Sequence, residues 1–380
     1  MPRFLHTADW QIGRQYARFE AEDAAALAEA RFTTVERLAQ LAADEQVDAV
    51  LVAGDIFDAQ TLSDRTLHRT FHAMGGFAGP WIMLPGNHDA ALAESIWSRA
   101  RRIGAIPKNV YLLHEPEVCV LEESGAAILP APLTQRQTHH DLTAWFDGAE
   151  TPQGLLRIGL AHGSVEGQLP ESADSPNPIA ADRAATAQLD YLALGDWHGL
   201  KQIDERTWYS GTPEQERFKD NGAGQALLVE IASPGAVPRV EARPIGQHSW
   251  YQWRRRLAVD SDLDALLAEL EALPAMSVVD LTLSGQLDLA GQQRLEQALG
   301  AVAGRHRSLQ AHTAELALMP TAEDIAALHA DGYVGNVIAE LQQRQADGSA
   351  ASETARHALV ILAGMLRDHG PALEISEGQA

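Results

Sequence analysis

The chain contains 380 residues, of which 52 are acidic and 29 are basic, so its formal net charge is −23. Its length predicts two or three domains, and its hydrophobic content of 46% with one cysteine, Cys119, excludes a disordered chain, a collagen-like repeat and a disulfide scaffold. The negative charge argues against a protein that wraps DNA through its own basic surface. No apolar run approaches the roughly 20 residues that span a bilayer, and no signal peptide precedes the first strand-like run, so we expect a cytoplasmic protein.

One pattern recurs through residues 1–245. A short apolar run is followed by a turn rich in Gly, Asp or His and often by a helix. Apolar runs without alternation are typical of strands buried on both faces. The runs lie at 3–6, 49–53, 81–84, 127–129, 156–160 and 191–194. A helix is expected over about 23–46, with apolar residues at steps of three and four except at Arg31. The pattern predicts an α/β class with helices layered over a central sheet.

The residue composition changes near residue 246, and aromatic residues and three arginines fall within 250–256. Residues 246–320 predict a small α+β unit with helices at 262–272 and about 290–304 and strands at 277–283 and about 308–318. Residues 321–380 predict a helical tail, with one helix starting at Thr321, a polar linker at 346–352 and a second helix at 353–369.

Polar side chains gather in five turns, each directly after one of the apolar runs. The turns are Asp9-Trp10-Gln11, Gly54-Asp55-Ile56-Phe57-Asp58, Gly86-Asn87-His88-Asp89, His162-Gly163 and Gly195-Asp196-Trp197-His198-Gly199. In open α/β sheets ligands bind beyond the carboxyl ends of the strands, so we expect these turns to meet. Their Asp, Asn, His and Gln side chains suit Mn²⁺, Fe²⁺, Zn²⁺ or Mg²⁺. They are about enough for two ions, which can clamp a phosphate between them.

The ordered motifs D-x-[H], G-D-x-x-D, G-N-H-D, a lone H and G-[H]-x-H resemble those of the calcineurin-like metallophosphoesterases. The H-T-A-D-W opening and the appended C-terminal units are similar to the SbcD-type DNA-repair exonuclease branch, whose nuclease subunits work with an SMC-like ATPase. The resemblance is strong over the first 245 residues and loose over the remainder. It implies a layered metallophosphoesterase fold of central β-sheets flanked by helices, a small α+β capping domain and C-terminal helices.

The resemblance also implies a role for each matching residue. It places Asp9, Gln11, Asp55 and His198 on a first metal ion and Asp55, Asn87, His162 and Asp196 on a second. His88 would not bind metal but would protonate the leaving oxygen or stabilise charge on the phosphoryl group, and Asp89 would orient its imidazole. The expected cofactor is two divalent ions, Mn²⁺ first, with Mg²⁺ or Fe²⁺ as alternatives.

Two positions depart from the family pattern. Gln11 stands where the family usually has His, and Asp196 stands where the first His of G-H-x-H belongs. Each exchange replaces an imidazole nitrogen with an oxygen, so one hypothesis is a working dinuclear site shifted towards Mn²⁺ or Mg²⁺. The alternative hypothesis is a weakly held first ion and reduced activity.

Other residues have a structural interpretation beside a functional one. His6 is interpreted as a core or supporting histidine, and Asp58 as a structural or supporting carboxylate rather than a ligand. Arg14 and Tyr16 either contact substrate phosphates or belong to a plain loop. The segment 250–256 has the composition of a nucleic-acid surface, but the first interpretation is an interdomain strand with solvated arginines.

Three functions follow. The first is a metal-dependent DNA exonuclease/endonuclease, the nuclease subunit of a DNA repair complex with an SMC-like coiled-coil ATPase of the SbcC type. The second is a small-molecule phosphodiesterase or phosphatase, and the third is a catalytically weakened scaffold. By resemblance, the helices in 321–369 dock on the ATPase coiled coil and the nuclease domain forms a homodimer; alternatively, the helices pack on their own domain. Without that partner, we expect weak DNA binding with a shallow salt dependence.

Overall fold

The computed structural model describes residues 1–169, 177–319, 332–346 and 351–369. The chain divides into two compact units, Met1–Trp250 and Tyr251–Ala380, and each is described by itself. Within the described ranges, no helix combines the length and the apolar character needed to cross a membrane.

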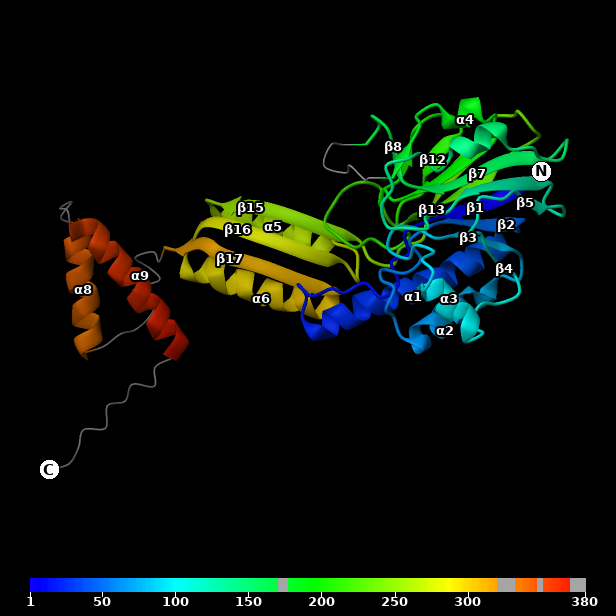
Figure 1. Ribbon diagram of the computed structural model, residues 1–380. Coiled ribbons are helices and arrows are strands. Elements are labelled where there is room, and N and C mark those ends of the chain that lie inside the picture. Colours follow the sequence, from blue (N-terminus) through cyan, green and yellow to red (C-terminus); the bar gives the residue numbers. More distant parts are fainter. Residues whose placement is uncertain (170–176, 320–331, 347–350, 370–380) are drawn as a thin grey trace. The chain divides into compact units, whose positions relative to one another are not determined.

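The first unit contains two six-stranded sheets rather than a single central sheet (Figure 1). The strand order of the first sheet is β14 (Arg239–Pro244), β13 (Gln225–Glu230), β1 (Arg3–Thr7), β2 (Ala49–Ala53), β3 (Trp81–Leu84) and β4 (Val110–Leu112). Strands β1 to β4 are parallel, whereas β13 and β14 pair antiparallel. The carboxyl ends of β1, β2 and β3 therefore point to the same edge.

The second sheet supplies the two other strands that end in polar turns, at His162 and at Gly195. Its order is β11 (Lys201–Gln202), β12 (Thr207–Tyr209), β10 (Tyr191–Gly195), β7 (Leu156–His162), β6 (Ala126–Ala131) and β5 (Cys119–Leu121). Strands β12, β10, β7 and β6 are parallel, and the two edge strands run antiparallel to their neighbours. A short separate sheet pairs β8 (Ser164–Val165) with β9 (Pro178–Ile179).

The two sheets pack face to face, and helices cover their outer faces (Figure 1). The helices are α1 (Ala21–Asp44), α2 (Asp64–Ala73) and α3 (Ile96–Arg102) against the first sheet and α4 (Arg183–Thr186) against the second. Alternate residues of β2 show the layering, because Val50 and Val52 face the helices while Leu51 faces the other sheet. Both faces are therefore apolar, which explains the unbroken hydrophobic run.

The sequence predicted much of this unit. All six apolar runs lie in strands, the expected helix is α1, and the α/β class with layered sheets and helices is confirmed. The single central sheet is corrected to two, because apolar runs indicate buried strands but do not show which strands pair. Arg31, the exception in the apolar pattern of α1, is fully buried.

The second unit contains a three-stranded sheet with helices packed on one face. Its elements are β15 (Trp250–Leu257), α5 (Asp260–Ala272), β16 (Val278–Leu287), α6 (Leu289–Arg305) and β17 (Ser308–Leu318), which match the predicted helices and strands. Leu266 of α5 and Leu295 of α6 pack in one cluster with Leu281 of β16. Two further helices, α8 (Gly332–Ala346) and α9 (Ala351–His369), pack through Ile338 and Leu359.

The helix expected to start at Thr321 begins outside the described residues. The division of this part of the chain into a capping domain over 246–320 and a tail over 321–380 stays a prediction.

Candidate metal centre

Seven of the predicted site residues lie at one edge of the first unit, where strands of both sheets end. The first sheet contributes Asp9, Gln11, Asp55 and Asn87, and the second contributes His162, Asp196 and His198. Contacts across the two sets, such as His162 Nε2 to Asp55 Oδ1 at 3.6 Å, show that both sheets deliver side chains to one place. The five turns therefore converge at the carboxyl ends of two sheets instead of one.

The backbone at this edge is strained. Four of the seven residues have positive φ angles, namely Asp9 at 53°, Gln11 at 50°, Asp55 at 53° and Asp196 at 98°. The left-handed region is unfavourable for residues with a Cβ, although Asp tolerates it better than most. Strained positions of this kind persist only where the surrounding structure imposes them, and they concentrate at functional sites.

Two glycines allow the turns to approach each other. A Cβ on Gly86 would lie 2.2 Å from Asp55 Oδ1 and 2.4 Å from the Asp55 backbone nitrogen. A Cβ on Gly54 would lie 2.4 Å from His162 Nδ1, and this glycine also has φ of 90°. Side chains at these two positions would separate Asp55 from its neighbours, so the motifs G-D and G-N-H require glycine for steric reasons.

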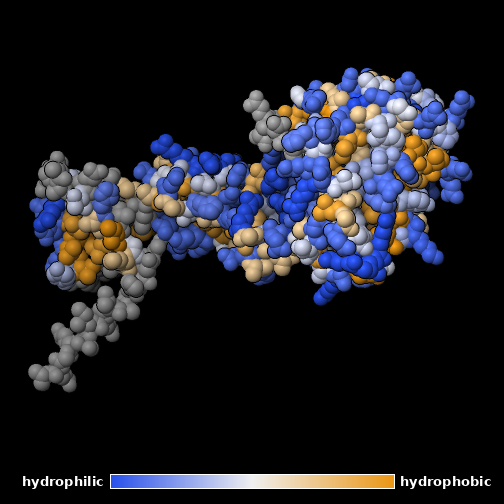
Figure 2. All heavy atoms as spheres, viewed as in Figure 1, coloured by the Kyte–Doolittle hydropathy of each residue, from blue (hydrophilic) through white to orange (hydrophobic). Residues whose placement is uncertain are grey.

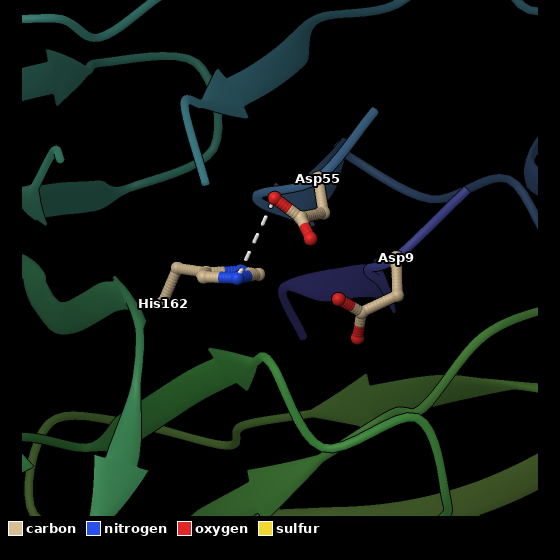
Figure 3. A group of neighbouring side chains, drawn as sticks. All are labelled: Asp9, Asp55 and His162. Carbon is tan, nitrogen blue, oxygen red and sulfur yellow. Dashed lines mark ion pairs between the residues drawn. The ribbon is translucent and has the colours of Figure 1, made fainter. Parts of the chain in front are cut away.

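The centre of the site is formed by Asp9, Asp55 and His162 (Figure 3). Each offers one ligand atom, and these atoms lie within 4.8 Å of one another. All three residues are buried. Carboxylate oxygens and an imidazole nitrogen so close together form a donor set that suits a divalent first-row metal.

His162 is held in the tautomer that metal binding requires. Its Nδ1 lies 2.8 Å from the carbonyl oxygen of Ala53, which can only accept, so Nδ1 carries the hydrogen. Nε2 then faces the site, 3.0 Å from Asn87 Oδ1 and 3.7 Å from Asp196 Oδ1. Burial lowers the pKa of His162, but the nearby carboxylates raise it more, to about 9. The ring therefore takes up a proton where a cation is absent.

His198 is held in the same way by a residue that the sequence did not reveal. Its Nδ1 lies 2.6 Å from Oε1 of the buried Glu216, and its Nε2 lies 3.9 Å from Asp9 Oδ1. A carboxylate behind a histidine fixes its tautomer and leaves Nε2 for a metal. The only sequence signal for Glu216 is an acidic residue in G-T-P-E-Q-E after a short strand, which is also typical of a solvated loop.

The side-chain oxygen of Gln11 indicates whether the residues of the site fit a metal ion. Its amide nitrogen donates to Asp55 Oδ2 at 2.8 Å, and its Oε1 is buried without a hydrogen-bond partner. A buried carbonyl oxygen without a donor is costly, and a cation in the site would satisfy it. The residues present therefore fit a divalent ion, with Gln11 in place to bind through its oxygen.

His88 and Asp89 are placed differently from each other. His88 is 42% exposed at the side chain, its backbone N–H donates to Asp55 Oδ1 at 2.9 Å, and its Nδ1 lies 3.0 Å from the backbone oxygen of Asp58. The carboxylate of Asp89 accepts the backbone N–H groups of Gly86 and Phe57 at 2.7 and 3.1 Å.

The imidazole of His88 is therefore oriented by Asp58, whereas Asp89 holds the turns that carry the site. This differs from the expectation that Asp89 orients the ring. Burial raises the pKa of Asp89 to about 8.

The remaining candidates have structural roles or lie beside the site. His6 is fully buried between the Tyr191 hydroxyl and the Leu194 carbonyl oxygen, which agrees with a core histidine, and burial lowers its pKa to about 3. Arg14 contacts Asp58 Oδ1 at 3.3 Å and so lies close to His88.

The aromatic and arginine segment at 250–256 follows a strand pattern. The ring of Trp250 packs against Phe19 and Phe218, and Arg255 pairs with Glu269 of α5. Arg254 and Arg256 are exposed. These contacts agree with a structural strand.

Residues 2–223 match the family described as calcineurin-like phosphoesterase. The chain belongs to this family. It is 40% identical over 284 residues to the SbcD subunit of the nuclease SbcCD from Rhodobacter capsulatus, covering 62% of this chain and 68% of the relative. It is 28% identical to the subunit of the same name in Escherichia coli K12, covering 63% and 67%. The DNA double-strand break repair protein Mre11 of Methanosarcina acetivorans is 24% identical, covering 75% of this chain and 46% of that protein.

These relatives confirm the resemblance to the SbcD-type branch that the motifs indicated. Family membership agrees with the geometry, because the family motifs are the turns that carry the buried carboxylates and imidazoles. The chain is a metal-dependent phosphoesterase, and the site at the joined sheet edges is its candidate metal centre.

Metal affinity is predicted to rise with pH. Between about pH 6, where burial places the pKa of Asp9, and about pH 9, the pKa of His162, an ion that binds His162 must displace the proton on its imidazole. Calorimetric titration of the metal-free protein with Mn²⁺ should show affinity rising up to about tenfold per pH unit between pH 6.5 and 8.5. The variant His162→Asn should show a weaker dependence, because His198, whose pKa burial lowers but the contact with Glu216 raises more, still gives up a proton to an ion, and a flat profile in the unchanged protein would contradict the assignment.

Proposed function

We propose that the chain is a metal-dependent DNA exonuclease/endonuclease, the nuclease subunit of a DNA repair complex. The observation that carries the proposal is the buried group Asp9, Asp55 and His162, in a chain whose relatives are named as nuclease subunits and as a DNA repair protein. A phosphodiester is the substrate that suits a site with several oxygen ligands and an exposed histidine beside them.

The proposed site holds two divalent ions. The first is assigned to Asp9, Gln11, Asp55 and His198 and the second to Asp55, Asn87, His162 and Asp196. Most of these ligands are oxygens, which favours Mn²⁺ over softer metals, with Mg²⁺ or Fe²⁺ as the alternatives. Bound there, the ions supply Lewis-acid chemistry to the phosphodiester and balance the charge of the carboxylates.

His88 is proposed to protonate the leaving oxygen. Its Nδ1 is held by the backbone oxygen of Asp58, so the ring cannot turn away without losing that contact. Its Nε2 is directed to the site, 4.0 Å from Asp55 Oδ2, and the ring is open to a substrate. In the protonated ring Nε2–H is placed to give its proton to the departing 3′ oxygen, and the hydrogen at Nδ1 stays with Asp58.

A small basic rim favours DNA over a neutral substrate. Arg14 lies beside Asp58, the side chain of Arg217 is 49% exposed next to His198, and the Lys219 ammonium lies 4.3 Å from the ring centre of Trp197. These cations border the candidate metal centre in a chain with a net charge of −23. They are suited to the phosphates on either side of the cleaved bond.

The C-terminal helices are proposed to bind an SMC-like coiled-coil ATPase of the SbcC type. Figure 2 shows apolar side chains gathered over α8 and α9. Tyr333, Ile361 and Met365 are 82, 61 and 57% exposed, which is unusual for large apolar residues. A helix pair with such a surface is suited to packing against another helix. A homodimer through the nuclease domain belongs to the same proposal.

Replacement of His88 by alanine should strongly reduce cleavage without loss of metal. We expect Mn²⁺-dependent degradation of end-labelled linear duplex DNA to fall by about 10²- to 10⁴-fold, because a proton donor is removed. Calorimetry should show unchanged Mn²⁺ affinity, since His88 is not a ligand. The control His68→Ala changes an exposed histidine of α2. Cleavage confined to small phosphodiesters would favour the small-molecule function, and full activity in His88→Ala would contradict the assigned role.

The variant Gln11→His should separate the two hypotheses about the first ion. If Gln11 binds through its oxygen, the unchanged protein takes up two Mn²⁺ ions, and the variant keeps both while its preference for Zn²⁺ over Mn²⁺ increases. Quantitative metal analysis after equilibration would measure this, with Gln15→His as a control on the exposed side of the same loop. One ion in the unchanged protein and two in the variant would support the weakly held ion, and no metal in either would refute the site.

Binding of the isolated chain to DNA should be weak and only mildly salt-dependent. Two or three rim cations predict a slope of about −2 to −3 when the logarithm of the binding constant is plotted against that of salt concentration. Fluorescence anisotropy with a duplex at 50 to 200 mM salt, with EDTA to prevent cleavage, would measure it. Tight binding with a slope steeper than about −6 would show that the chain has an extended basic surface.

A further inference from the structure

A buried ionic cluster lies behind His198 and outside the candidate metal ligands. Its centre is Glu216, whose side chain is 1% exposed. Glu216 Oε2 lies 2.8 Å from Arg14 Nε and 3.1 Å from a terminal nitrogen of Arg31. The other oxygen, Oε1, contacts His198 Nδ1 at 2.6 Å and also the neighbouring Arg217. Arg14 and Arg31 therefore hold one oxygen of the carboxylate, and the imidazole shares the other with Arg217.

Arg31 connects this cluster to the first metal-ligand turn. It is the residue that interrupts the apolar face of α1, and its side chain is 1% exposed. Besides Glu216, its guanidinium donates to the backbone oxygen of Trp10 at 2.6 Å and to the Tyr16 hydroxyl at 2.9 Å. Trp10 lies between Asp9 and Gln11. One buried side chain thus contacts both the turn after β1 and the carboxylate behind His198.

We propose that Glu216 is a positioning residue for the metal site and that Arg31 locks it in place, an inference that rests on the proposed metal-dependent function. The contact to Glu216 fixes the hydrogen on Nδ1 of His198, so Nε2 keeps a lone pair directed towards Asp9. Outer partners of this kind typically change metal affinity by 10- to 100-fold when they are removed. His198 is the candidate metal ligand that Glu216 contacts, and it is through this imidazole that Glu216 acts on the ion.

Glu214 provides a matched control from the same segment. Its residue exposure is 2%, against 4% for Glu216, so both carboxylates are buried. Glu214 accepts from the Thr34 hydroxyl at 2.6 Å and from the backbone nitrogens of Gln247 and His248 at 2.8 and 3.1 Å. None of these contacts reaches a candidate metal ligand. A purely structural role for buried acids in this segment would therefore affect both residues alike.

The experiment compares Glu216→Gln with Glu214→Gln in the full chain by calorimetric titration of the metal-free proteins with Mn²⁺. In Glu216→Gln we expect the affinity of one of the two Mn²⁺ ions to fall 10- to 100-fold, because Arg14 and Arg31 take the amide oxygen and leave the amide NH2 group, which can only donate, facing Nδ1 of His198. In Glu214→Gln we expect less than a twofold change. Equal losses in both variants, or no loss in Glu216→Gln, would overturn the proposal.

A double-variant cycle identifies the route of the effect. If Glu216 acts through His198, then Glu216→Gln combined with His198→Gln should bind Mn²⁺ no more weakly than His198→Gln alone. Losses that multiply would overturn the proposal. Should Glu216→Gln fail to fold by circular dichroism, Glu216→Asp, which keeps the charge but shortens the side chain, is put through the same titration and cycle with the same criteria.

Mn²⁺ affinity tests the role of Glu216, whereas degradation of DNA tests the proposed nuclease function, so either can fail without the other. A protein that binds Mn²⁺ with the expected dependence on Glu216 but degrades no DNA would refute the nuclease and leave the positioning role intact. An active nuclease whose Mn²⁺ affinity is unchanged in Glu216→Gln would refute the positioning role alone.

Discussion

The repulsion among three carboxylates is the constraint on which the site depends. Asp9 and Asp55 are buried and Asp196 beside them is half-buried, so their charges need positive partners. The ring of His162, whose pKa these carboxylates raise, and the amide N–H of Gln11 offset only part of this charge. The rest of the arrangement, from the left-handed turns to the glycines that let them approach, serves to hold these groups together. Divalent cations are the partners that such an excess of oxygen ligands accepts.

The sequence predicted that the turns converge. It did not predict which side chains contact and orient the candidate ligands and His88. Asp55 and His162 could be placed together because each follows an apolar run, and parallel strands deliver their carboxyl ends to one edge. The apolar runs alone suggested one sheet, since strand pairing leaves no trace in such runs, whereas the family resemblance implied more than one. The exchange of roles between Asp58 and Asp89 was missed because adjacent residues of a tight turn point in directions that spacing does not encode. Glu216 was missed because its burial depends on partners far away in the sequence.

The acidic composition and a nucleic-acid substrate are compatible once distance is considered. Charges on a protein surface act over roughly 8 Å at physiological salt. A phosphate at the site would therefore be influenced mainly by the rim formed by Arg14, Arg217 and Lys219 and by any cations in the centre, and much less by remote acids. Remote acids instead oppose contact away from the site. The expected result is a surface that tolerates DNA at one place and repels it elsewhere.

The origin of the ligands in two separate sheets has a mechanical consequence. The first ion would join Asp9 and Gln11 of one sheet to His198 of the other, and the second would join Asn87 to His162 in the same way. Hydrogen bonds of His6 to Tyr191 and of His162 to Ala53 already join the two sheets, and metal coordination is directional as well. The metal centre would therefore add two directional links between the sheets at one edge, so that loading the ions reinforces the lateral alignment of the two layers.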